Sequence, residues 1–99
     1  MSIFYLMVEA VPKQSNPESK EFGGAFINLW VKATTKNEAL KKAKSYIDKV
    51  EWQFIKAEEI SVAQRSIYTD KPDSLECYDE ACENGLGAIF YTWAIGEEI

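Results

Sequence analysis

The sequence contains no histidine, and this absence removes a large part of enzyme chemistry. Histidine is the commonest general base, and catalytic triads and most transition-metal centres depend on it. The two cysteines, Cys77 and Cys82, cannot supply the usual Cys/His tetrad of a zinc site by themselves. We therefore expect no metal and no cofactor. An enzyme built on this sequence has to work with carboxylates, lysines, tyrosines or a cysteine.

Glycine-rich phosphate loops and long apolar segments are also missing. Phe22-Gly23-Gly24 and Gly85-Leu86-Gly87 lack the spacing and the lysine of a phosphate loop, so we interpret both as turns. The longest apolar run is Ile3 to Val8, whereas a helix that crosses a bilayer needs about 20 apolar residues. The first residues also lack the basic start and cleavage site of a signal peptide. We expect a cytoplasmic protein with no membrane partner.

Positive charge is scarce, with 11 basic residues against 16 acidic ones and a net charge of -5. Such a field repels phosphate backbones and anionic lipid headgroups. Domains that stack RNA bases on an open sheet combine the aromatic stack with basic residues that follow the phosphates. Nucleic acid is therefore excluded as the expected partner.

A disulfide within the chain is not expected either. Cys77 and Cys82 lie five residues apart in a segment with helical periodicity, which points their side chains about 140° apart. Disulfide geometry requires the two Cβ atoms to face one another. We interpret both cysteines as small apolar residues of a helix.

What the chain does contain fits one small globular domain over residues 1–99. Hydrophobic residues make up 46% and charged residues 27%, both close to the averages for soluble proteins. The apolar segment Ile3–Val11, stopped by Pro12, predicts a first strand. Residues 12–24 are rich in Pro, Gly, Ser and charge, which predicts an exposed connection. Residues 25–33 alternate with period two, which predicts a second strand with two different faces.

Two capping boxes predict the helix starts. Thr35 with Glu38 precedes apolar residues at helical spacing up to Val50, and Asp73 with Glu76 precedes a second helix that ends at Asn84-Gly85. Residues 88–95 are apolar and aromatic, which predicts a last strand, and the final four residues are interpreted as a short tail.

Residues 51–67 are ambiguous, because their apolar positions change parity near Glu58 and Glu59. They form either one long strand with a bulge or two strands. We expect an α+β, two-layer sandwich with an antiparallel sheet of four to five strands and two helices on one face. If residues 51–67 split, residues 25–95 form a ferredoxin-like βαββαβ unit with an extra N-terminal strand.

The sheet face away from the helices is the most informative feature. If Ile27, Leu29 and Val31 face the helices, then Phe26, Asn28, Trp30 and Lys32 face away from them. The same alternation assigns further residues to this face: Tyr5, Met7 and Glu9 from the first strand and Tyr91 and Trp93 from the last. An uncovered sheet face normally carries polar side chains, so we expect a covering: a second copy, another protein, a small apolar ligand, or the 12–24 loop.

Self-association is the favoured function, because symmetric dimers are common and aromatic patches are typical of interface cores. The expected contact residues are Tyr5, Glu9, Asn28, Trp30, Tyr91 and Trp93, and a small ligand enclosed there belongs to the same hypothesis. Two alternatives stay open. A cofactor-free enzyme would use Glu9 with Tyr5 or Tyr91, unless Glu9 simply pairs with Lys32. An immunity-type inhibitor would bind a basic partner through the acidic residues Glu76, Asp79, Glu80 and Glu83.

The run GGAFINLWVKATTKNEALKKAKSYI, the Trp52 that follows it and the ending ACENGLGAIFYTW resemble small bacterial proteins of uncharacterised function with a ferredoxin-like α+β fold. The resemblance covers most of the chain. It implies a fold and no residue role, because the ferredoxin-like fold carries many unrelated functions.

Overall fold

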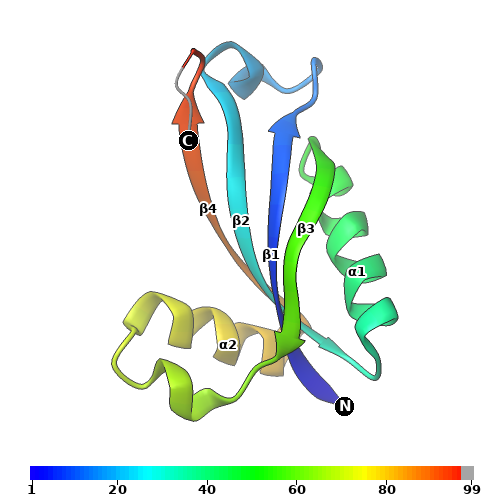
Figure 1. Cartoon of the computed structure of the whole chain (residues 1–99), viewed down its shortest axis with the longest axis vertical. Helices are drawn as coiled ribbons and strands as arrows, with labels where there is room; N and C mark the ends of the chain where they lie inside the picture. The colour runs from blue at the N-terminus through cyan, green and yellow to red at the C-terminus, as the bar shows by residue number, and fades with distance from the viewer. Residues whose placement is uncertain (97–99) are drawn as a thin grey trace.

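The computed structural model describes residues 1–96, which form an antiparallel sheet with two α-helices (Figure 1). The elements in chain order are β1 (Ser2–Pro12), a short 3-10 helix η1 (Pro17–Lys20), β2 (Phe22–Ala33), α1 (Lys36–Lys49), β3 (Trp52–Val62), a second 3-10 helix η2 (Arg65–Tyr68), α2 (Pro72–Asn84) and β4 (Leu86–Ala94). The α+β class and the antiparallel sheet are confirmed. Apart from Gly96, the predicted C-terminal tail lies outside the described residues.

The strand order is β3-β1-β2-β4, and each neighbouring pair is antiparallel. β1 and β2 form the centre of the sheet, with Leu6 opposite Leu29 and Val8 opposite Ile27. These four side chains have no exposed surface. The hairpin of β1 and β2 is therefore the scaffold on which both edge strands and both helices are placed.

The ambiguous segment forms one bulged strand, β3. Along β1, the partner changes from Glu59 at Met7 to Ala57 at Val8, which leaves Glu58 as an extra residue. A second shift leaves Ile55 as an extra residue. Each extra residue reverses the parity of the next part of the strand, which explains the mixed apolar pattern. A ferredoxin-like unit requires two strands here, so that arrangement and a fifth strand are not confirmed within residues 1–96.

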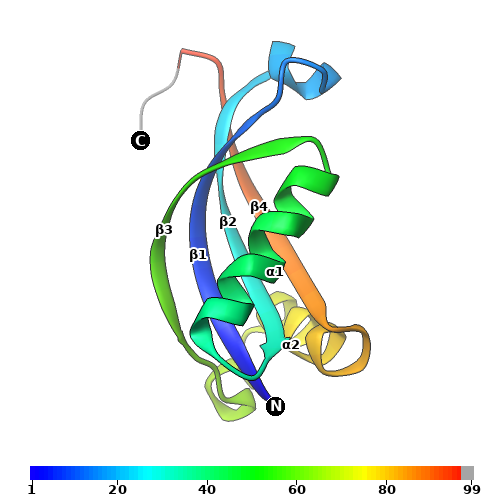
Figure 2. The same cartoon turned by 90° about the vertical axis from the view of Figure 1, so that its right-hand side faces the viewer.

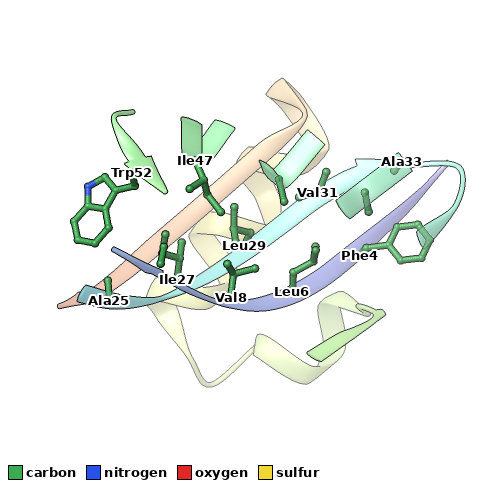
Figure 3. Packing of buried hydrophobic residues seen from close by; sticks show 13 residues of the cluster. Phe4, Leu6, Val8, Ala25, Ile27, Leu29, Val31, Ala33, Ile47 and Trp52 are labelled. Atoms are coloured by element: carbon green, nitrogen blue, oxygen red, sulfur yellow. The ribbon is translucent and has the colours of Figure 1, made fainter. Parts of the chain in front are cut away.

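The two helices lie on opposite faces of the sheet, which corrects the expectation of two helices on one face (Figure 2). The first core cluster joins Leu6, Val8, Ile27 and Leu29 to Ile47 of α1 (Figure 3). A second cluster joins Ile3, Trp30 and Ala81 of α2 on the other face. The reason is that β1 places large apolar side chains on both faces of the sheet, and β2 places Trp30 on the face opposite α1. Each face therefore offers an apolar surface to one helix.

The first helix start is confirmed and the second is wrong. The Thr35 hydroxyl accepts a hydrogen bond from the Glu38 N–H at 3.1 Å, and Glu38 in turn accepts one from the Thr34 hydroxyl at 2.9 Å. By contrast, α2 begins at Pro72, and its cap residue Lys71 makes no side-chain capping bond. Proline is favoured in the first turn because the N–H it lacks would have no helical partner there. The predicted stop is confirmed, since Gly85 ends α2 with a φ of 99°.

Gly87 sets how closely α2 approaches β4. A Cβ atom on this residue would lie 2.3 Å from the carbonyl oxygen of Cys77 in α2. We predict that Gly87→Ala destabilises the fold by about 1–3 kcal/mol, because the backbone of α2 has to move away from the sheet. Urea denaturation followed by circular dichroism measures this loss. Thr92→Ala, at an exposed side chain of the same strand, is the control, and equal stability of the two variants would contradict the close contact.

Candidate interaction face of the sheet

The face of the sheet opposite α1, here called the second face, carries every residue that the sequence assigned to it. Across the central pair, Tyr5 lies opposite Trp30 and Met7 opposite Asn28. Glu9 lies opposite Phe26, which in turn lies opposite Tyr91 of β4. The register therefore gathers the predicted contact residues on one face of the sheet, although α2 also lies on this face and the prediction had left it free of helices: Tyr5, Glu9, Asn28, Trp30, Tyr91 and Trp93.

One end of the second face is covered by α2 and η2, and Trp30 lies beneath them. Its side chain is 1% exposed, and its ring centroid is 5.6 Å from that of Tyr68 in η2. Assigning Trp30 to a contact surface was therefore wrong, because α2 packs on this face rather than beside α1. Trp30 Nε1 has no hydrogen-bond partner among residues 1–96. Tyr68 was missed by sequence reasoning, since it falls in the segment between the third strand and the second helix.

Tyr5 and Asn28 stand at the border between the covered and the open end. The Tyr5 hydroxyl donates a hydrogen bond to Asn28 Oδ1 at 3.1 Å. Burial raises the pKa of Tyr5, and the nearby Glu59 carboxylate raises it further. Tyr5 is therefore a neutral hydrogen-bond donor that holds the Asn28 amide. The two side chains satisfy one another across the sheet, which leaves less of their polar capacity for a ligand.

The open end of the second face carries three aromatic rings, here called the aromatic patch: Phe26, Tyr91 and Trp93. The rings of Phe26 and Trp93 lie 5.4 Å apart at an angle of 51°. Tyr91 is 52% exposed. A Cβ on Gly24 would lie 2.3 Å from Trp93 Cζ2, so the Trp93 ring lies directly over this glycine. The Gly-Gly pair interpreted as a turn is thus part of β2, and its missing side chains make room for the ring.

The proposed acid–base pair is not assembled. Glu9 and Tyr5 are four residues apart on one strand, which separates their Cα atoms by about 13 Å. Tyr91 lies two strands from Glu9, a distance of about 10 Å. Lys32 lies at the far end of the face, where its Nζ donates to the Cys82 carbonyl oxygen at 3.3 Å, so its predicted pairing with Glu9 is wrong. Lys56 of β3 is the residue opposite Glu9.

The connection between β1 and β2 bends toward the α1 side of the sheet. Asn16, 5% exposed, donates from Nδ2 to the Glu51 carbonyl oxygen at 3.0 Å, and the Lys13 N–H donates to the same oxygen. Glu51 lies in the turn between α1 and β3. Glu18 of η1 borders a hollow next to Trp52 and Phe90, on the α1 face. The loop is anchored away from the aromatic patch, and Tyr91 stays exposed.

Two cavities lie elsewhere in the fold. One of about 350 Å³ is bordered by Ile3, Lys32 and Tyr78, and one of about 300 Å³ by Tyr46 and Trp52. Neither reaches Glu9, Asn28 or the aromatic patch.

Cys77 and Cys82 are free thiols. Residues 1–96 contain no group of three acidic, cysteine or histidine side chains arranged to hold a metal ion. In this same range, each helix is too short or too polar to span a membrane.

No protein-family model, curated protein or solved structure matches this chain. The resemblance to small bacterial proteins therefore stays a prediction. The candidate site depends on the geometry of this chain alone.

The partly buried Tyr5 hydroxyl gives a pH prediction. A tyrosine whose pKa is raised by folding stabilises the fold fully below its unfolded pKa of about 10, and this contribution is lost as the pH rises further. We expect Tyr5→Phe to show a shallower loss of stability above about pH 10 than the unmodified chain. Some loss remains, because burial also raises the pKa of Tyr46. The midpoint of urea unfolding, measured at several pH values above about 9, gives this loss of stability for both proteins. An identical dependence of the midpoint on pH in Tyr5→Phe and in the unmodified chain would contradict the burial of Tyr5.

Proposed function

We propose that this chain is a non-enzymatic protein that forms a homodimer through its sheet, with the aromatic patch at the contact. The observation that carries the proposal is the uneven covering of the second face. α2 and η2 bury Trp30 at one end, whereas Phe26, Tyr91 and Trp93 lie at the end that no helix of residues 1–96 covers.

The chemistry of the patch supports this proposal. Interface cores are enriched in Tyr, Trp and Phe and are depleted of charge. Each aromatic side chain can bury about 150–250 Å² when a partner covers it. The three rings occupy neighbouring positions on β2 and β4, so one partner surface covers all of them at once.

The surroundings of the patch match the polar rim of an interface. On the β1 and β3 side, Glu9 lies opposite Lys56, and Met7 opposite Glu59. Charged side chains at a rim remain in contact with water and add little to affinity. Two copies that each carry a net charge of -5 repel at long range, so apolar contact has to supply the attraction.

The open sheet face also favours association over catalysis. Glu9 and the two tyrosines proposed as its partners are spread across the face, and both cavities lie away from them. A small apolar ligand trapped between two copies remains part of the proposal. The aromatic patch would form one of its walls.

The proposal predicts that a charge placed on the patch weakens the dimer. Tyr91→Glu should raise the dissociation constant at least tenfold, because two carboxylates would then be buried near one another. Sedimentation equilibrium over a range of concentrations measures this. Ile67→Glu is a matched control, since Ile67 is also 52% exposed and lies in η2 at the other end of the molecule. A chain that is monomeric at every concentration, or equal weakening by both variants, would refute the proposal.

A second candidate is an inhibitor of a basic partner, which the exposed face of α2 favours. Asp79 is occupied by Arg65, whose guanidinium donates to both of its carboxylate oxygens and lowers its pKa. Four further acidic residues of α2 are exposed and make no ion pair among residues 1–96: Asp73 and the predicted Glu76, Glu80 and Glu83. The affinity for such a basic partner should fall steeply as the salt concentration rises, and it should also fall in the Glu76→Gln variant. Contact through the aromatic patch should respond to neither change.

A further inference from the structure

The two edges of the sheet differ in chemistry. β3 forms one edge, and it carries two bulges and the charged residues Lys56, Glu58 and Glu59. Bulges and charge are the common devices that prevent an edge strand from pairing with another chain. β4 forms the other edge, and its nine residues include no charge and no proline. Within the described part of the chain, edge protection is therefore present on β3 and absent on β4.

The backbone of β4 is regular along this unprotected edge. It pairs with β2 residue by residue from Leu86 to Trp93, and the single register shift places the extra residue, Gly23, in β2. Figure 2 shows β4 at the margin of the sheet, beyond β2. An edge strand without bulges presents its free amides and carbonyls at regular intervals, which is the geometry that another strand can match.

The hydrogen bonds identify which amides are free. The Lys32 N–H donates to the Gly85 carbonyl oxygen at 2.9 Å, and the Ile95 N–H donates to that of Glu21. In an antiparallel pair, inward and outward groups alternate along the strand. The odd-numbered residues of β4 therefore bond to β2. The even-numbered residues direct N–H and C=O away from the sheet: Leu86, Ala88, Phe90, Thr92 and Ala94.

We propose that two copies join by antiparallel pairing of β4 with β4 about a twofold axis at Phe90, so that their sheets become continuous. This inference rests on the proposed self-association and names its contact. Centring on Phe90 uses every outward group from Leu86 to Ala94. It sets Ala88 opposite Thr92 of the second copy and Ile89 opposite its Tyr91. No like charges oppose one another in this ladder, although each copy is acidic.

The same register joins the edge to the aromatic patch. It sets Gly87 opposite Trp93 of the second copy, on the second face. Because the strands are antiparallel, the open end of one copy then lies beside the end covered by α2 in the other. Within the chain, Trp93 already packs over Gly24, a residue without a side chain. The paired strands thus bring the uncovered rings of each copy next to the covering helix of its partner.

A second copy is a better occupant than a strand of another kind. Pairing β4 with β3 of another copy would be head to tail and would form an open filament, and the bulges and charges of β3 oppose it. Pairing β4 with itself closes after two copies and leaves both protected edges outermost. Binding of a foreign strand instead predicts a monomer at all concentrations of the pure protein.

Proline at an outward position tests the pairing. Thr92→Pro removes an N–H that makes no bond to β2, and proline is tolerated on edge strands in that orientation. We expect Thr92→Pro to raise the dissociation constant at least tenfold while Thr92→Ala leaves it unchanged. If Thr92→Pro still forms the dimer as tightly as Thr92→Ala does, the edge pairing is overturned and self-association stands. If the unmodified chain is monomeric, both proposals fail.

Cross-linking tests the register independently of the proline variant. In a background with Cys77→Ser and Cys82→Ser, Ala88→Cys and Thr92→Cys are prepared separately and mixed under mild oxidation. Hydrogen-bonded antiparallel pairs have Cα atoms about 5.5 Å apart, within disulfide range. We expect a disulfide-linked heterodimer in the mixture. Its absence, or equal cross-linking within each variant alone, overturns the pairing about Phe90.

Discussion

The structure depends on one interaction, the antiparallel pairing of β1 with β2, in which the strands bring large apolar side chains to both faces of the sheet. On the α1 side, Leu6, Val8, Ile27 and Leu29 are fully buried, and each such burial is worth about 1.5–3 kcal/mol relative to exposure. On the other side, Trp30 provides an equivalent surface. A central pair of this kind needs cover on two faces, and residues 1–96 provide only two α-helices. Each face therefore receives one helix, and one helix does not cover a whole face.

The open end of the second face follows from this shortage of cover. α1 lies along its own face of the sheet (Figures 1 and 2). α2 is joined to β4 through Gly85, and its close contact at Gly87 holds it near the start of that strand. The far end of β4, with Tyr91 and Trp93, lies beyond its reach. Local chain connection thus decides which aromatic residues are buried and which remain available to a partner.

Much of this fold could be predicted from the sequence, because its local signals agree with the tertiary structure. The period-two pattern of residues 25–33 and the cap at Thr35 predicted β2 and the start of α1. The face that α2 occupies could not be predicted, since β1 and β4 are apolar at both parities. The face on which α2 packs decides whether Trp30 is a surface or a core residue. The predicted start of α2 at Asp73 was also wrong, because Pro72 already occupies the first turn of the helix.

For the candidate site, parity was enough to collect the residues on one face and not enough to say which of them are covered. Tyr68 buries Trp30, yet it comes from a short 3-10 helix with no periodic signal. Trp93 depends on Gly24, a contact between strands that sequence spacing cannot show. The predicted pairing of Glu9 with Lys32 ignored their distance along the strands. Residues that share a face form a site only if they are uncovered and close to one another, and both properties depend on the tertiary structure.

The most direct test of the account is an NMR measurement of the surroundings of Trp30 in solution. If the two helices cover opposite faces, the indole protons of Trp30 show nuclear Overhauser contacts to the Tyr68 ring and to the Ala81 methyl group of α2. Contacts from Trp30 to Ala43 of α1, or rapid solvent exchange of its indole N–H, would contradict the account.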